Sequence, residues 1–108
     1  MPLNFHGRWN LKLQDCSRFS DAKEIRVFGN MIELVGYKGS INKVIILNSN
    51  TVDVQYTISD GSGEFHDSET YILRDGGRAL QVGTVDDAPV FYKCPLITEN
   101  GISNAQNQ

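Results

Sequence analysis

The strict alternation of apolar and polar side chains in residues 51–59 (TVDVQYTIS) constrains the fold of this chain more than any other feature. In an extended strand, successive side chains point to opposite faces, whereas an α-helix would scatter them around its axis. Alternation therefore predicts a half-buried β-strand. The four residues on its apolar face are Val52, Val54, Tyr56 and Ile58.

The same period of two recurs along the chain. Near the start, Trp9, Leu11 and Leu13 alternate with polar residues, so we expect these three side chains to face inward. Glycine, Asn and Asp, which tolerate the positive φ of tight hairpins, separate the runs. Further strands are predicted at residues 22–28, 31–37, 41–47, 51–59, 65–74, 78–84 and 89–96.

Eight consecutive strands of this kind predict an all-β fold, an eight-stranded antiparallel up-and-down barrel. Closure of the sheet removes the two unpaired edges that an open meander would leave. A two-sheet β-sandwich is the structural alternative. For 108 residues we expect one barrel domain, residues 1–97, followed by a polar, flexible C-terminal tail, residues 98–108.

The opening residues carry a family resemblance. Phe5 followed by Gly7-Arg8-Trp9 resembles the Gly-x-Trp signature that begins the first strand of lipocalins and other calycin-like barrels. The resemblance implies that Trp9 closes the barrel floor beneath a basic side chain of the last strand, here Lys93. The layout also looks like small secreted bacterial barrels, some of them inhibitors, in which an early cysteine and a final Lys-Cys pair frame the fold.

Two cysteines, Cys16 and Cys94, bracket almost the whole predicted barrel. Their spacing does not fit a metal motif, so they are either two buried thiols or one disulfide. A disulfide requires residues 15–21 to fold back across the barrel end, because adjacent first and last strands run antiparallel. If bridged, the protein is expected to be periplasmic or secreted; otherwise it is expected to be cytoplasmic. The start, MPLNFHG, lacks the features of a signal peptide, and the prior removal of a leader stays open.

Composition excludes some classes of function. The net charge is −3 and the chain has no Lys/Arg run, so nucleic acid is not an expected partner. The longest apolar stretch is far shorter than the roughly 20 residues of a membrane span. We therefore expect a non-catalytic binding protein without a cofactor. Its ligand is a small apolar or amphipathic molecule held by the barrel interior (Trp9, Leu11, Leu13, Val52, Val54, Tyr56 and Ile58). The alternative is a protein-binding module, such as an inhibitor of a secreted hydrolase, that acts through loops or the outer face.

The segment EFHDSE is the one place where a histidine stands among carboxylates and a serine. Strand alternation places His66 and Ser68 on one side and Asp67 on the other. This arrangement is common on polar surfaces, so a hydrolase-type site around His66 is an alternative that the sequence does not favour. A calcium loop is not expected, because Phe65 stands where such a loop needs glycine.

Apolar residues also occupy positions that alternation places outside. If Ile32 points inward, residues 31–37 present apolar side chains outward, and the run VIIL (residues 44–47) is apolar on both faces. With a turn at residues 38–40, these two strands would be neighbours and form one apolar patch, a candidate homodimer or partner interface. The predicted interface residues are Met31, Val35, Tyr37, Ile45 and Leu47.

Overall fold

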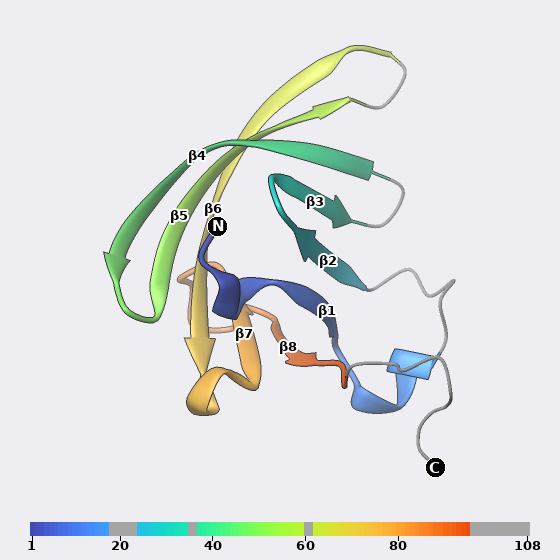
Figure 1. Cartoon of the computed structure of the whole chain (residues 1–108), viewed down its shortest axis with the longest axis vertical. Helices are drawn as coiled ribbons and strands as arrows, with labels where there is room; N and C mark the ends of the chain where they lie inside the picture. The colour runs from blue at the N-terminus through green and yellow to red at the C-terminus, as the bar shows by residue number, and fades with distance from the viewer. Residues whose placement is uncertain (18–23, 35–36, 60–61, 96–108) are drawn as a thin grey trace.

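The structure is a computed structural model that describes residues 1–17, 24–34, 37–59 and 62–95. It is a closed, eight-stranded, antiparallel barrel in which strand order follows the chain and β1 pairs with β8 (Figure 1). The predicted up-and-down barrel is confirmed. The strands are β1 (Gly7–Asn10), β2 (Ile25–Phe28), β3 (Met31–Leu34), β4 (Tyr37–Asn48), β5 (Thr51–Ser59), β6 (Glu64–Arg74), β7 (Ala79–Val82) and β8 (Val90–Lys93). Three 3-10 turns, η1 (Leu3–Phe5), η2 (Leu13–Ser17) and η3 (Asp75–Gly77), complete the described elements.

The strands have very unequal lengths. β4, β5 and β6 contain 12, 9 and 11 residues, whereas the five other strands contain four each. The long strands form one curved sheet whose β5–β6 end rises above the short strands in Figure 1. As a result β3 pairs with only the first part of β4, and β7 pairs with only the last part of β6.

The core fills the part of the barrel where long and short strands face each other. Nearly every strand contributes inward-facing side chains to this core. The largest fully buried apolar residues are Trp9, Tyr71, Phe5, Ile32, Leu80, Val27, Val52 and Val54. β5 supplies an unbroken apolar row, as its alternation predicts, and its bounds match the predicted strand.

The first strand is shorter than predicted. β1 ends at Asn10, and Leu13 lies in η2 with 57% of its surface exposed, so the expected inward position of Leu13 is wrong. Leu11 is half-buried against the core. The chain leaves the sheet early because η2 folds back over β1 to bring Cys16 beside Cys94.

The turn between β3 and β4 also differs from the prediction. Leu34 pairs with Tyr37 and Ile32 with Gly39, so residues 38–40 belong to β4 and form no turn. Gly39 is needed for close packing instead. A Cβ atom there would lie 3.0 Å from Ile32 Cγ2 and 3.3 Å from Tyr56 Cδ2.

The barrel domain that the sequence analysis placed at residues 1–97 is described up to residue 95. The predicted tail, residues 98–108, lies outside the described residues.

Candidate functional site

The residues predicted to line a ligand cavity form the hydrophobic core. Trp9, Val52 and Val54 are fully buried and Tyr56 is 5% exposed, while Ile58 and Leu11 are half-buried at the edge of the cluster. Leu13 lies outside the barrel. These side chains fill the interior of the barrel by packing against one another.

Trp9 takes the position that the Gly-x-Trp resemblance implied. It pairs with Lys93 of β8, whose Nζ lies 5.3 Å from the centroid of the indole ring. The indole Nε1 donates a hydrogen bond to the Phe5 carbonyl at 3.1 Å. Gly7 has a φ of +126°, and a Cβ atom there would lie 3.4 Å from Lys93 Cε, so the glycine permits both the backbone bend and the closely packed lysine.

The inward-facing side chains of β6 change from apolar to acidic along the strand. Leu73 and Tyr71 are buried, but the next two inward positions carry carboxylates, Glu69 opposite Val54 and Asp67 opposite Tyr56. Phe65, the last residue of the row, pairs with Ile58 and is 52% exposed. We call Phe65, Asp67 and Glu69 the acidic mouth.

The acidic mouth affects the ionisation of its neighbour. Burial, and then the negative charges of Asp67 and Glu69, raise the pKa of the Tyr56 phenol to about 12. Asp67 is exposed and Glu69 half-buried, so both carboxylates are available at the open part of the sheet. From the sequence, Asp67 and Glu69 were considered only as neighbours of His66, although Phe65, Asp67, Glu69 and Tyr71 alternate with polar residues there.

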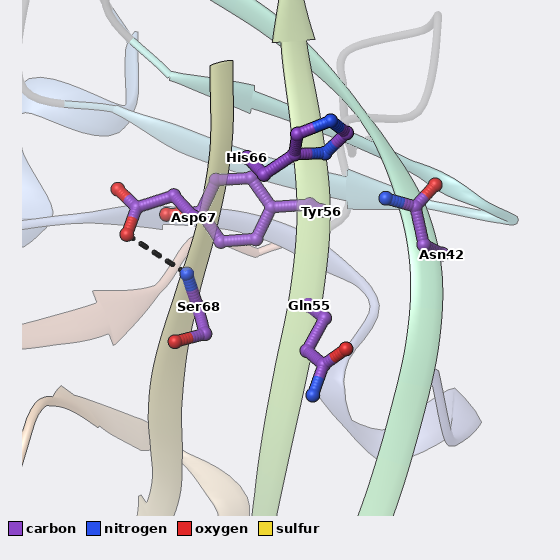
Figure 2. A pocket seen from close by; sticks show the side chains of 6 residues that line it. All are labelled: Asn42, Gln55, Tyr56, His66, Asp67 and Ser68. Atoms are coloured by element: carbon purple, nitrogen blue, oxygen red, sulfur yellow. Dashed lines mark hydrogen bonds between the residues drawn. The ribbon is translucent and has the colours of Figure 1, made fainter.

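Six residues of β4, β5 and β6 line a polar depression of about 430 Å³: Asn42, Gln55, Tyr56, His66, Asp67 and Ser68 (Figure 2). Asn42 Nδ2 donates a hydrogen bond to Thr57 Oγ1 at 2.6 Å, and Thr57 Oγ1 lies 3.1 Å from His66 Nδ1. The depression therefore presents amide, hydroxyl, imidazole and carboxylate groups.

The register confirms that His66 and Ser68 share one face while Asp67 faces the other. His66 pairs with Thr57 and Ser68 with Gln55, whereas Asp67 pairs with inward-facing Tyr56. Figure 2 shows the Asp67 carboxylate pointing away from the imidazole; it accepts a hydrogen bond from the Ser68 backbone N–H at 2.8 Å. Among the described residues, no hydrogen bond joins His66 to Ser68 or Asp67, so the three side chains do not assemble a triad.

A buried ionic cluster that the sequence analysis missed lies on the outer face of β1. Glu24, 6% exposed, accepts hydrogen bonds from Arg8 Nη2 at 2.8 Å and Asn10 Nδ2 at 2.9 Å, and it also pairs with Arg26. Burial alone would raise the pKa of the Glu24 carboxyl, but the bonds from Arg8, Arg26 and Asn10 and the charge of Arg8 outweigh it and lower the pKa to about 2. Arg8 and Asn10 alternate with inward-facing Trp9, so the strand pattern alone places them toward solvent, but η2 packs over this side of β1.

The predicted disulfide between Cys16 and Cys94 is confirmed, with Cα atoms 5.5 Å apart. The backbone N–H of Cys94 donates to the Arg8 carbonyl at 2.8 Å, and Arg8 Nη2 donates to the Cys16 carbonyl at 2.6 Å. The bridge thus closes over the ionic cluster and joins the segment after β1 to the end of β8.

The predicted apolar interface is not one contiguous patch. Met31 is outward-facing and 40% exposed, but it pairs with Ser40, where β3 leaves β4. Ile45 pairs with Asp53 on the outer face further along β4, and Leu47, 54% exposed, lies at a register shift near the β4–β5 hairpin. Tyr37 shares the inward side with its partner Leu34, so its predicted outward position is wrong. Val35 lies outside the described residues.

The fold and these sites define a small β-barrel protein stapled by a single disulfide between described cysteines. Comparison of the chain with protein-family models, with curated proteins and with solved structures finds no match. Among the described residues, no helix has the length and apolar character to cross a membrane. The same residues include no group of three or more His, Cys, Asp or Glu side chains placed to hold a metal ion.

Proposed function

We propose that this protein is a non-catalytic protein-binding module of an oxidising compartment, periplasmic or extracellular, and that it contacts a basic partner protein through the acidic mouth. The observation that carries the proposal is the pair of carboxylates, Asp67 and Glu69, on a sheet face that is otherwise apolar. Local departures from a consistent pattern occur in folded proteins chiefly at functional sites.

The chemistry of the mouth favours a protein surface as partner. Phe65, half-exposed beside Ile58, offers an apolar contact, and the two carboxylates beside it offer hydrogen bonds and ion pairs to Lys or Arg side chains. Charges of this kind accelerate association with a basic partner and select against acidic ones. The resemblance to small secreted barrels favours an inhibitor of a secreted hydrolase as the particular role.

A small apolar ligand in the barrel interior is the less favoured function. Trp9, Val52 and Val54 are fully buried in the core, so a ligand between them would have to displace core side chains. The carboxylates at the mouth would also repel the head group of a fatty acid. The disulfide supports the compartment, because such bridges persist in oxidising surroundings.

The test measures binding of the immobilised, disulfide-intact chain to a panel of secreted hydrolases of basic and acidic isoelectric point. We expect basic members to bind, with affinity that falls as salt is raised. Asp67→Asn should weaken binding. Asp75→Asn is the matched control, because it makes the same charge change in η3, at the other end of β6.

Equal weakening by the two variants would contradict a specific role for the mouth. A second measurement follows fluorescence of an apolar dye and of a labelled fatty acid with the same chain. Saturable binding of either, lost on mutation of Ile58 and without any protein partner, would favour the small-ligand function instead.

A further inference from the structure

Among the described strands, the second half of β4 is paired on one side only. β3 pairs with Tyr37–Ser40 only, and the last contact on this side is the hydrogen bond from Ile41 N to the Asn30 carbonyl at 2.7 Å. From Lys43 to Asn48, the described partner of β4 is β5 alone. Figure 1 shows β4 curving away from β3 toward the β4–β5 hairpin. Backbone N–H and C=O groups on this edge can therefore accept another strand.

The side chains along this edge are apolar and exposed. Ile45 is 37% exposed, Ile46 65% and Leu47 54%, and Lys43 carries the single charge between residues 43 and 48. Ile46 pairs with inward-facing Val52 and is still largely uncovered. An exposed apolar edge strand is a template for strand addition.

The first half of β6 is a second edge that no other described strand than β5 pairs with, and its side chains differ from those of β4. β7 pairs with β6 only from Tyr71 onward, apart from a hydrogen bond from Gly83 N to the Thr70 carbonyl, so residues 64–69 have β5 as their one described partner strand. This edge carries Glu64, Asp67 and Glu69, and like charges brought opposite each other oppose pairing with a second copy. The β4 edge lacks any such protection beyond Lys43.

We propose that a second copy of this chain occupies the β4 edge, with the two β4 strands antiparallel across a two-fold axis. Centred on Ile45, this pairing sets Val44 opposite Ile46 and Lys43 opposite Leu47, so no like charges meet. A closed two-fold interface pairs the β4 edges of both copies at once, so no further copy can add to either of them. The two long-strand sheets become one continuous sheet across the dimer, and the two acidic mouths stay outside the interface.

The test is sedimentation velocity of the disulfide-intact full chain over a concentration series. We expect the wild type to show a reversible monomer–dimer equilibrium. Ile46→Lys places one positive charge from each copy in the apolar β4–β4 interface and should weaken dimerisation by about a hundredfold. Val85→Lys is the matched control, since Val85 is 63% exposed in the connection between β7 and β8, and it should dimerise like the wild type.

Amide hydrogen exchange of the wild type keeps the proposal testable if Ile46→Lys fails to fold. Alternate amides between Lys43 and Leu47 should gain protection as concentration rises, while those of residues 65–69 should not change. A wild type that stays monomeric, even one that binds a foreign peptide at β4, would overturn the proposal, as would a dimer whose β4 amides exchange unchanged. Asp67→Asn should dimerise normally, so failure here is separable from failure of the proposed function.

Discussion

Glu24 shows how much a single buried carboxylate can contribute to the stability of the fold. It is almost fully buried yet remains ionised, because three donors, from Arg8, Asn10 and Arg26, satisfy its oxygens. Asn10 Oδ1, also buried, has no hydrogen-bond partner among the described residues. Glu24 accepts a hydrogen bond from each of Arg8, Asn10 and Arg26, so removal of its negative charge would weaken all three links of the cluster.

We predict that stability falls in acid through Glu24. Its pKa is depressed to about 2 in the folded chain, so the unfolded chain binds the proton more tightly and stability is lost as the pH falls from about 4.5 toward 2. The full loss is about 3 kcal/mol, because one pKa unit corresponds to about 1.4 kcal/mol. Urea unfolding between pH 6 and pH 2 should show this slope in the wild type and in the exposed control Glu64→Gln. In Glu24→Gln the slope should be much shallower, and an unchanged slope would show that other carboxylates cause it.

At the scale of elements, the pairing of β5 with β6 determines where charge meets the core. β5 presents only apolar side chains inward, whereas β6 turns from Tyr71 to Glu69 and Asp67 on the same side. Tyr56 lies at this boundary, with its ring buried and its direct cross-strand partner charged. The phenol is therefore a reporter of the acidic mouth.

We predict that the pKa of Tyr56, raised to about 12, falls when Asp67 is replaced by Asn. Burial, the larger cause, remains, but one of the two negative charges that disfavour the phenolate is removed. Because the folded chain holds this proton more tightly, Tyr56 contributes stability below pH 10 that is lost as the pH rises toward about 12. Titration by NMR of carbon-labelled tyrosine rings measures each residue separately. Asp53→Asn, on the outer face of β5, is the control and should leave Tyr56 unchanged.

At the scale of the whole molecule, the disulfide joins the two ends of the barrel. Cys16 and Cys94 are 78 residues apart in sequence, and the bridge encloses nearly every described strand. β1 and β8 share only two paired positions, so their seam is the shortest in the barrel. The bridge supplements this seam and also positions η2 over the ionic cluster.

We predict that native, unreduced protein contains no alkylatable thiol and that reduction lowers its thermal midpoint. For a loop of this length, loss of the cross-link removes about 4 to 5 kcal/mol of stability in the chain-entropy view. Mass spectrometry after alkylation, with and without reductant, measures the thiols, and a Cys16→Ser/Cys94→Ser variant should melt like the reduced wild type. Two free thiols in native material would contradict the bridge.

The local sequence pattern predicts much of this fold. Residues 51–59 form β5 with the predicted bounds, because alternation and the flanking turns act within a few residues of one another. Hydrophobic period and turn residues likewise predict the number of strands and their antiparallel order, since consecutive strands joined by short turns can pair in few other ways. The Gly7-to-Trp9 signature also places Trp9 beneath Lys93, as observed.

Non-local contacts decided the rest. Leu13 leaves the barrel because η2 must carry Cys16 back to Cys94, and residues 38–40 extend a strand because Gly39 packs beneath Ile32. The burial of Glu24 depends on residues that approach it from β1 and are distant in sequence. Likewise the carboxylates of β6 lie beside the core because pairing with β5 places their row on the inward side. Alternation divides the side chains of a strand between two faces. Only the neighbouring strands determine which face is inside and at which residue that face becomes exposed to solvent.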